Sequence, residues 1–314
     1  MSIVLGLDAG GTRVTALAAD GGGRILGEGV GGPANPRAVP WETAVASLRA
    51  AASQALAVAG LDDLPDVAVV GMAGATTSEI QAAYGAQLEA VGLAQRVCVV
   101  EDARIAVAGA TEKGEGVILI SGTGVNAFGV LGRRTARASG WGYLVGDEGS
   151  GFDIGRRAIS AVLWAHDGRG PATALTDALL QAWNVSAPEG LLDRVYEIPP
   201  PRDAIAALSQ VVADVARQGD AVAQNIYEKS GYHLALAAAA VVRRLEMDPS
   251  QATIATVGGV FRTGELIRTP IRATLQAQLG FLPALIEPLH PPAYGAVRLA
   301  LADLPQSPPL PACP

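Results

Sequence analysis

One pattern occurs twice in this sequence: a short apolar strand, a glycine-rich turn, and a second strand. The first copy, IVLGLDAGGTRVTALAAD, begins at residue 3, and the second, GVILISGTGVNAFGVLG, begins at residue 116. Asp8–Thr12 of the first copy aligns with Ile120–Gly124 of the second. An internal repeat of a supersecondary unit indicates a duplicated architecture. We therefore expect two related α/β domains that face each other across a cleft.

Strand and helix patterns alternate around the two copies, as in an α/β protein. With 314 residues the chain has room for two domains, since a domain usually holds about 100–200 residues. We expect an N-terminal domain of residues 1–112 plus about 290–314, a C-terminal domain of residues 113–289, and a frayed proline-rich tail over 305–314. After a three-stranded meander over 3–30, the expected strands are 67–72, 96–100, 252–257 and one near Leu285; the expected helices are 42–59, 78–91, 103–110, 151–165, 172–183, 202–218, 220–245 and one from about Pro292.

Charge and hydropathy argue against two classes of partner. The formal net charge is −7, whereas a nucleic-acid-binding surface needs a basic face that neutralises phosphates. The longest apolar stretch, Leu234–Val242, is far shorter than the roughly 20 residues of a membrane span. The N-terminus has no basic region followed by an apolar signal core. We expect a cytoplasmic protein with neither nucleic-acid nor membrane partners.

The turn of the first copy carries Asp8 and Gly10-Gly11-Thr12. Two glycines let a phosphate approach the backbone without meeting a Cβ atom, and the Thr12 hydroxyl can donate a hydrogen bond to it. Asp8 ends a strand at the same turn, where its carboxylate can hold Mg²⁺ through water. An ordinary Gly-Gly hairpin turn is the alternative interpretation.

The turn of the second copy, Ser121-Gly122-Thr123-Gly124, is a second candidate phosphate site. Together with Ala127 it also fits G-x-G-x-x-A, the fingerprint of dinucleotide-binding folds. That fingerprint should open a helix, but Val125–Leu131 contains β-branched and aromatic residues and leads into a Gly-Arg-Arg turn, which predicts a strand. The sequence has no Walker A lysine motif. We therefore favour a strand–turn–strand clasp for phosphate.

Two further glycine-rich segments suit ligands. The loop GWGYLVGDEGSG, Gly140–Gly151, suits a polar ligand, because Trp141 offers a flat face and the carboxylates accept hydroxyl protons. A long surface loop that ends in a helix cap at Ser150 is the alternative. Later, a strand leads into Gly258-Gly259 and a helix, an arrangement that suits an adenosine lying against backbone, with Thr263 capping the helix.

Asp102 is the candidate catalytic carboxylate. It stands at the carboxyl end of a predicted strand, where open α/β sheets place catalytic groups. The same position suits a helix N-cap, a favoured place for Asp, and position alone does not separate the two interpretations. The neighbouring Glu101 is a competing candidate.

Taken together, these segments resemble the superfamily of actin, heat-shock chaperones and sugar kinases. Its phosphate-1 motif matches Asp8–Thr12, its phosphate-2 motif matches Ser121–Gly124, and its adenosine motif matches Gly258-Gly259. Within the superfamily, LDAGGT, LISGTG and GWGYLVGDEGS are similar to the N-acetylglucosamine kinase branch. That branch is grouped with the BadF/BadG-type activator ATPases of benzoyl-CoA reductase and 2-hydroxyacyl-CoA dehydratase. The resemblance covers the whole chain in order, and it implies two duplicated ribonuclease H-like (actin-like ATPase) domains facing a central cleft.

The resemblance also implies roles for individual residues. Asp102 would take the proton of the sugar hydroxyl, and Asp8 would lie near Mg²⁺. Asn35, in the loop after the third strand, would bind the sugar together with Trp141, Gly142 and Asp147. The ATP-binding residues would come from the three motifs and from the segment before residue 220; they are Gly10, Gly11, Thr12, Gly122, Thr123, Gly124, Gly219, Gly258, Gly259 and Thr263.

The implied function is an ATP-dependent kinase that phosphorylates an amino sugar, N-acetylglucosamine or glucosamine, at the 6-hydroxyl. Its cofactors would be ATP and Mg²⁺, and we expect a homodimer. A broad-specificity hexokinase and a non-catalytic ATP-binding regulator or activator are the alternatives. One departure argues against the activators, which hold an iron–sulfur cluster between two subunits through cysteines, one of them just after phosphate-2. Here that stretch is Val125–Phe128, and Cys98 and Cys313 fit no such arrangement.

Overall fold

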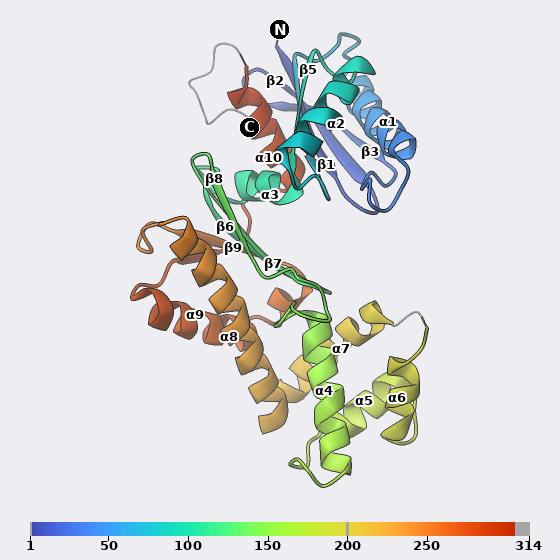
Figure 1. Cartoon of the computed structure of the whole chain (residues 1–314), viewed down its shortest axis with the longest axis vertical. Coiled ribbons are helices and arrows are strands. Elements are labelled where there is room, and N and C mark those ends of the chain that lie inside the picture. The colour runs from blue at the N-terminus through green and yellow to red at the C-terminus, as the bar shows by residue number, and fades with distance from the viewer. Residues whose placement is uncertain (1, 199–200, 305–314) are drawn as a thin grey trace. The chain divides into compact units, whose positions relative to one another are not determined.

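A computed structural model of the chain describes residues 2–198 and 201–304 (Figure 1). The chain divides into two compact units. Among the described residues, unit 1 contains 2–116, 129–135 and 287–304, and unit 2 contains 117–128 and 136–286. The predicted tail, 305–314, lies outside the described residues.

The first sheet belongs to unit 1 and has the strand order β3-β2-β1-β4-β5. The strands β1 (Ile3–Ala9), β2 (Val14–Asp20) and β3 (Ile25–Gly31) pair in antiparallel fashion, which confirms the predicted meander. The strands β4 (Val67–Met72) and β5 (Arg96–Glu101) join β1 in parallel. Every residue of β4 is buried, as expected for a parallel strand covered on both faces.

The second sheet repeats this order as β10-β9-β6-β7-β8. Its strands are β6 (Gly116–Ser121), β7 (Val125–Leu131), β8 (Arg134–Ala138), β9 (Thr253–Val257) and β10 (Ala284–Ile286), with β9 parallel to β6 and β10. Because β6 to β10 occupy the places of β1 to β5, each glycine turn joins the first and second strand of its sheet. The repeated topology confirms the predicted duplication of an α/β architecture.

Glycine allows helix α1 (Trp41–Ala59) to lie directly on the edge strand β3. A Cβ atom at Gly27, Gly29 or Gly31 would lie 2.1 Å from a backbone oxygen of α1. These glycines alternate along the strand, so they all face the helix. On this side of the sheet, the core is completed by residues of helix α2 (Ser78–Ala90).

The opposite side of the first sheet is covered by α10 (Pro292–Ala302), the red helix of Figure 1, although α10 lies at the other end of the sequence. A Cβ atom at Gly6 would lie 2.3 Å from the backbone nitrogen of Val297, so β1 and α10 are in close contact. Helix α3 (Asp102–Ala110) packs beside α10, and a Cβ at Gly295 would lie 2.0 Å from the Ile105 oxygen. The C-terminal helix therefore fixes the position of α3.

Unit 2 is rich in helices, as expected. Two helices start with side-chain caps, since Ser150 accepts from the Asp153 N–H and Asp220 accepts from the Ala223 N–H. The cap at Ser150 is the one expected in the alternative interpretation of the glycine-rich loop, a surface loop that ends in a helix cap. Helix α6 was not expected, and α5 starts three residues later than expected. The helices are α4 (Gly151–His166), α5 (Leu175–Trp183), α6 (Glu189–Val195), α7 (Arg202–Arg217), α8 (Ala221–Arg244), the 3₁₀ helix η1 (Gly259–Thr263) and α9 (Glu265–Leu279).

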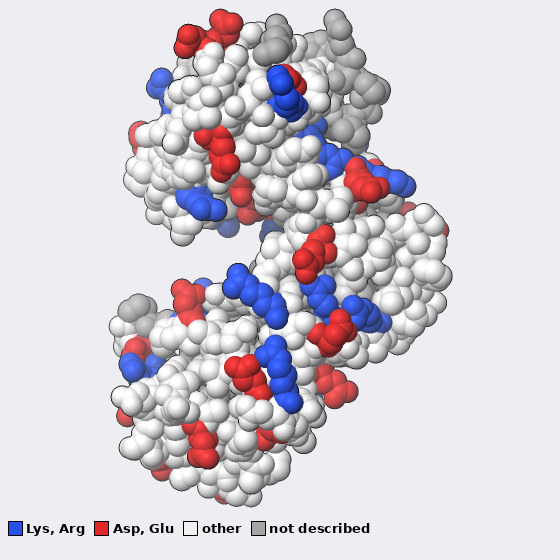
Figure 2. Space-filling view, turned by 180° about the vertical axis from the view of Figure 1, so that it is seen from behind, with Lys and Arg blue, Asp and Glu red and all other residues white. Residues whose placement is uncertain are grey.

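Two surface properties bear on partners. Within residues 2–198 and 201–304, no helix has the length and apolar character needed to cross a membrane. On the face shown in Figure 2, Lys and Arg side chains are interspersed with Asp and Glu side chains. This face therefore lacks the continuous basic surface that nucleic acid would need.

Candidate functional site

The first glycine turn is tied to the loop that carries Asn35. The Gly10 N–H donates to the Arg13 oxygen at 3.0 Å, and the Gly10 oxygen accepts from the Ala34 N–H, also at 3.0 Å. The Asn35 side-chain oxygen accepts from the Arg37 N–H at 2.9 Å, which fixes the orientation of the amide group. Unit 1 thus brings Asn35 next to the Gly10–Thr12 turn, two segments that the sequence separates.

Asp8 and Asp102 influence each other electrostatically. Burial raises the pKa of Asp8 above its ordinary value and the negative charge of Asp102 raises it further, whereas Arg13 lowers it. Both carboxylates lie at carboxyl ends of parallel strands, Asp8 in β1 and Asp102 just after β5. A divalent cation would be stabilised by this excess of negative charge.

The described residues contain no group of three or more His, Cys, Asp or Glu side chains that could hold a metal ion. Mg²⁺ keeps several waters and usually binds one or two carboxylates plus substrate phosphates, so a protein site for this ion needs few ligands. Asp8 is the carboxylate that would hold it.

Asp102 does not cap helix α3. Glu101 occupies the N-cap position, without a side-chain cap bond, and the Asp102 Oδ1 atom accepts only from the N–H of the next residue, Ala103, at 2.8 Å. The N-cap interpretation is therefore wrong, because a cap would bond to an N–H two or three residues further on. The carboxylate is half-buried at the start of the helix.

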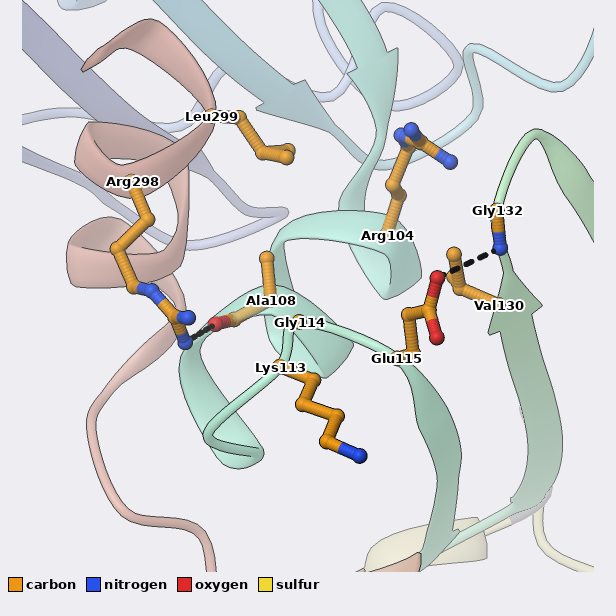
Figure 3. Close-up of a pocket in the computed structure, with 9 residues that line it drawn as sticks. All are labelled: Arg104, Ala108, Lys113, Gly114, Glu115, Val130, Gly132, Arg298 and Leu299. Atoms are coloured by element: carbon orange, nitrogen blue, oxygen red, sulfur yellow. Dashed lines mark hydrogen bonds between the residues drawn. The ribbon is translucent and has the colours of Figure 1, made fainter. Parts of the chain in front are cut away.

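The far end of α3 is anchored by Arg298 of α10 (Figure 3). Its guanidinium donates to the Ala108 oxygen at 2.5 Å, to the Thr111 oxygen at 2.6 Å, and to the Glu112 oxygen. A cation that bonds to the last carbonyls of a helix is stabilised by the helix dipole. Arg298 therefore helps to hold in place the helix that begins with Asp102.

In unit 2, the second glycine turn is joined to the loop before α4. The Gly122 oxygen accepts from the Gly151 N–H at 2.7 Å, and the Ser121 hydroxyl donates to the Gly149 oxygen at 2.9 Å. The Thr123 hydroxyl donates to the Asp203 carboxylate at 3.0 Å. Three of the predicted segments, the phosphate-2 turn, the glycine-rich loop and the start of α4, are therefore in contact.

The glycine-rich loop has several residues in the left-handed region. Ser139 has φ 64° and Asp147 has φ 58°, values that non-glycine residues rarely adopt and that often mark functional sites. Asp147 is buried, and a Cβ atom at Gly124 would lie 2.9 Å from its Oδ2 atom. Within the described part of the chain no hydrogen bond reaches this carboxylate. Trp141, by contrast, is 75 % exposed and free to stack on a ligand.

Asp153 was missed by the sequence reasoning. Its Oδ2 atom accepts from the Gly149 N–H at 3.0 Å, and its carboxylate pairs with Arg156 and Arg157, each at 2.8 Å. Burial would raise the pKa of Asp153, but these hydrogen bonds together lower it below the ordinary value. The spacing Ser150-x-x-Asp153, an acid three residues after a capping serine, was the available signal.

The adenosine segment lies against the phosphate-2 turn. Gly258 has φ 116°, and a Cβ atom there would lie 2.2 Å from the Ser121 oxygen, so only glycine fits this contact. The predicted cap at Thr263 is wrong, because α9 starts after Gly264 and the Thr263 hydroxyl donates to the Val260 oxygen at 2.7 Å.

Gly219 comes two residues after Arg217, whose guanidinium donates to the Thr263 oxygen of this segment at 3.3 Å. Its φ of 98° directly after α7 is also typical of a glycine that ends a helix.

Three glycines have no structural reason to be glycine. Gly11, Gly122 and Gly259 have no positive φ, and beyond the residues next to them in the chain and, for Gly259, the backbone of its own helix, no atom lies within 4 Å of the position where a Cβ would be. One of them lies in each of the three predicted nucleotide motifs. Neither a left-handed backbone nor a packing contact therefore requires glycine at these positions, and a Cβ there would stand in open space where a ligand could approach the backbone.

Similar proteins were found by family and by structure. Residues 5–300 match the BadF/BadG/BcrA/BcrD ATPase family. The chain is 32 % identical over 306 residues to an N-acetylmuramic acid/N-acetylglucosamine kinase of Clostridium acetobutylicum, covering 96 % of this chain and 99 % of the relative. It is 29 % identical over 283 residues to an N-acetyl-D-glucosamine kinase of Dictyostelium discoideum, covering 84 % and 87 %.

Among solved structures, a candidate N-acetylglucosamine kinase of Chromobacterium violaceum is similar with a TM-score of 0.66 and 25 % identity, covering 96 % of this chain and 99 % of the other. Sequence and architecture agree along nearly the whole chain. This chain belongs to the BadF/BadG/BcrA/BcrD ATPase family.

Proposed function

We propose that this chain is an ATP-dependent sugar kinase that phosphorylates an amino sugar, N-acetylglucosamine or glucosamine, at its 6-hydroxyl group. The observation that carries the proposal is the set of three glycines, Gly11, Gly122 and Gly259, that neither backbone conformation nor packing explains. Backbone that is open to a phosphate or an adenosine at all three nucleotide motifs is what ATP binding requires. Family membership and the named activities of the relatives support sugar kinase chemistry.

Phosphoryl transfer needs alignment and charge stabilisation more than covalent chemistry by the protein. In the proposed reaction the Asp102 carboxylate accepts the proton of the sugar hydroxyl. The sugar oxygen then bonds to the γ-phosphorus while the bond to the departing ADP oxygen breaks. Asn35, Trp141, Gly142 and Asp147 would orient the sugar. Mg²⁺, held through water by Asp8, would neutralise part of the negative charge on the phosphates.

Replacing Asp102 by Asn tests the assignment of the base. General-base catalysis contributes about 10²–10⁴-fold, so we expect kcat to fall by that factor while the Kd for ATP stays nearly unchanged. Glu101→Gln, one residue earlier, is the matched control and should retain most of the activity. An Asp102→Asn enzyme that keeps more than a tenth of the wild-type kcat would refute the role of Asp102.

A panel of sugars separates the alternatives. Sugar-dependent release of ADP distinguishes a kinase from a non-catalytic regulator. Relative kcat/KM for N-acetylglucosamine, glucosamine, N-acetylmuramic acid and glucose distinguishes an amino sugar kinase from a broad hexokinase. Phosphorus-coupled NMR of the product identifies the esterified hydroxyl, and a product other than the 6-phosphate would contradict the proposed position.

Three further properties belong to the proposal: a homodimer, a cytoplasmic location, and domains of residues 1–112 plus about 290–314 and of 113–289. Size-exclusion chromatography with light scattering measures the oligomeric state, and cell fractionation the location. Limited proteolysis should cut near the proposed boundaries.

A further inference from the structure

Unit 2 contains a pocket whose lining includes none of the residues assigned above to sugar or nucleotide. Its volume is about 580 Å³, which lies in the range of small-molecule sites. It lies among α4 from Arg156 to Trp164, the segment 170–172 and the first turns of α8. The lining residues used below are Arg156, Arg157, Trp164, Asp220, Ile226 and Lys229.

The pocket presents positive charge. Lys229 has no hydrogen-bond or ion-pair partner among the described residues, and the Arg156 side chain is 53 % exposed although it pairs with Asp153. The carboxylate that lines the pocket, Asp220, already accepts hydrogen bonds from the protein itself. It accepts from the Thr173 hydroxyl and from the Ala174 and Ala223 N–H groups at 2.8–3.0 Å.

The pKa of Asp220 reflects these hydrogen bonds. Burial alone would raise this pKa, but the hydrogen bonds to Asp220 lower it below its ordinary value. Asp220 therefore acts as a satisfied cap of α8, and the pocket offers donors that lack an acceptor. Such a set suits an anion, and phosphate above all, because the arginine fork matches phosphate oxygens.

The pocket also has an apolar wall. Trp164 is 52 % exposed, and the guanidinium of Arg169 lies 5.6 Å from the centre of its ring. Ile226 and Pro171 extend this surface. A bare anion would leave the wall unused, whereas the C–H face of a sugar or a flat base can lie against an indole ring. We propose that this pocket binds a small phosphate monoester whose organic part is a ring, either a sugar phosphate or a nucleoside monophosphate.

The pocket is connected to the loop before α4 by hydrogen bonds. Arg156 and Arg157 line the pocket and also hold Asp153, which in turn accepts from the Gly149 N–H. Gly149 is bonded to Ser121 of the phosphate-2 turn. A phosphate in the pocket competes with Asp153 for the arginine N–H groups and so loosens the hold on Gly149. A ligand bound here therefore weakens binding of the sugar. This consequence rests on the proposed function, in which Asp147 of the same loop binds the sugar.

The binding test uses the full chain with its kinase site filled by a non-hydrolysable ATP analogue, Mg²⁺ and the sugar that the panel selects. Glucosamine 6-phosphate, AMP and inorganic phosphate are titrated separately by calorimetry to millimolar concentration. Lys229→Gln is the test variant. Lys113→Gln is the matched control, because Lys113 is the only other lysine in the sequence and is exposed in unit 1.

We expect at least one monoester to bind the wild type and the control equally, and Lys229→Gln at least tenfold more weakly. The monoester that binds identifies the source of the ligand. Inorganic phosphate should bind more weakly than the monoester, since it leaves the Trp164 wall empty; Trp164→Ala should then remove the difference. No binding when the kinase site is filled, or equal binding to the two lysine variants, would overturn the proposal.

A second measurement tests the connection. The bound monoester should raise the Kd of the sugar about fivefold or more, the usual lower range for coupled sites, in the wild type but not in Lys229→Gln. An unchanged sugar Kd at saturating monoester would overturn the connection through Asp153. Both measurements record binding and need no turnover, so they can be interpreted even if the chain phosphorylates no sugar. Conversely, a chain that is an active sugar kinase could still fail to bind a monoester in this pocket, which would refute the pocket proposal alone.

Discussion

Gly258 and Gly259 are adjacent glycines with opposite requirements, and replacing each by Ala separates packing from ligand access. A Cβ at Gly258 would lie 2.2 Å from the Ser121 oxygen and 3.1 Å from the Gly122 nitrogen, both backbone atoms of the phosphate-2 turn. At Gly259, apart from its chain neighbours and the backbone of its own helix, no atom lies within 4 Å of the position of a Cβ. The same methyl group therefore has two different consequences at neighbouring positions.

The expected loss in the free energy of unfolding for Gly258→Ala is the sum of two costs. Its backbone, φ 116° and ψ 169°, lies in a region that is almost exclusive to glycine, and forcing Ala into such a region costs of the order of 1–3 kcal/mol. Overpacking a tight contact adds typically about 1–3 kcal/mol. The free energy of unfolding should fall by about 2–6 kcal/mol, which lowers the Tm of a unit of this size by at least about 4 °C. The Gly122 turn must also move, so ATP binds more weakly.

Gly259→Ala should leave stability unchanged or raise it by about 0.4–1 kcal/mol, because it restricts the unfolded chain without creating a clash. Its effect should appear in the affinity for ATP alone. Thermal and urea unfolding measure stability, and calorimetry with an ATP analogue measures affinity. If the two variants unfold at the same temperature, the contact between Gly258 and Ser121 is refuted. If Gly259→Ala binds ATP as the wild type does, Gly259 does not face the nucleotide.

Two further predictions concern the anchors of the site. Asp153→Asn removes a buried carboxylate that accepts from two partly exposed arginines, so at neutral pH we expect a loss of about 1–3 kcal/mol by urea unfolding and a higher KM for the sugar. Because the folded-state pKa of Asp153 is lowered, the wild type should lose its contribution as the pH falls from the ordinary value of 3.8 through the lowered one; a variant with the acid sensitivity of the wild type would contradict this. Arg298→Met removes the three carbonyl contacts at the end of α3, and we expect about 2–5 kcal/mol of destabilisation with a reduced kcat and an unchanged Kd for ATP, partly rescued in Arg298→Lys. Wild-type kcat in Arg298→Met would show that α3 needs no such anchor to position Asp102.

The duplicated topology could be predicted because its signals are local. Hydrophobic alternation and turn residues identify strands in the sequence itself, and the repeat of strand, glycine turn and strand shows that the unit occurs twice. Short apolar runs also located β4 and β5 within one residue of their observed ends. Ser150 was identified as a helix cap for the same reason, since capping depends on residues only three positions away.

Features that depend on distant segments could not be predicted. The sequence placed Gly27 and Gly29 in the third strand of the meander, but it could not show that these glycines, together with Gly31, accommodate α1. Thr263 looks like a helix cap, yet the intervening Gly264 has φ 69° and delays the start of α9. In each case, long-range packing decides between local alternatives of similar free energy.

The glycines of this chain therefore carry different information, and their physical environment separates them. A glycine costs about 0.5–1 kcal/mol relative to Ala in a helix or strand, so each needs a compensating reason. At Gly6 and Gly258 the reason is backbone packing, since a Cβ would lie within 2.3 Å of another backbone atom. At Gly60 and Gly280 it is a left-handed φ after a helix. Gly11, Gly122 and Gly259 have neither reason, and they fall at equivalent turns of the two sheets and at the end of β9. These three glycines share open space beside the backbone, and that space compensates for the cost of glycine only when a ligand occupies it.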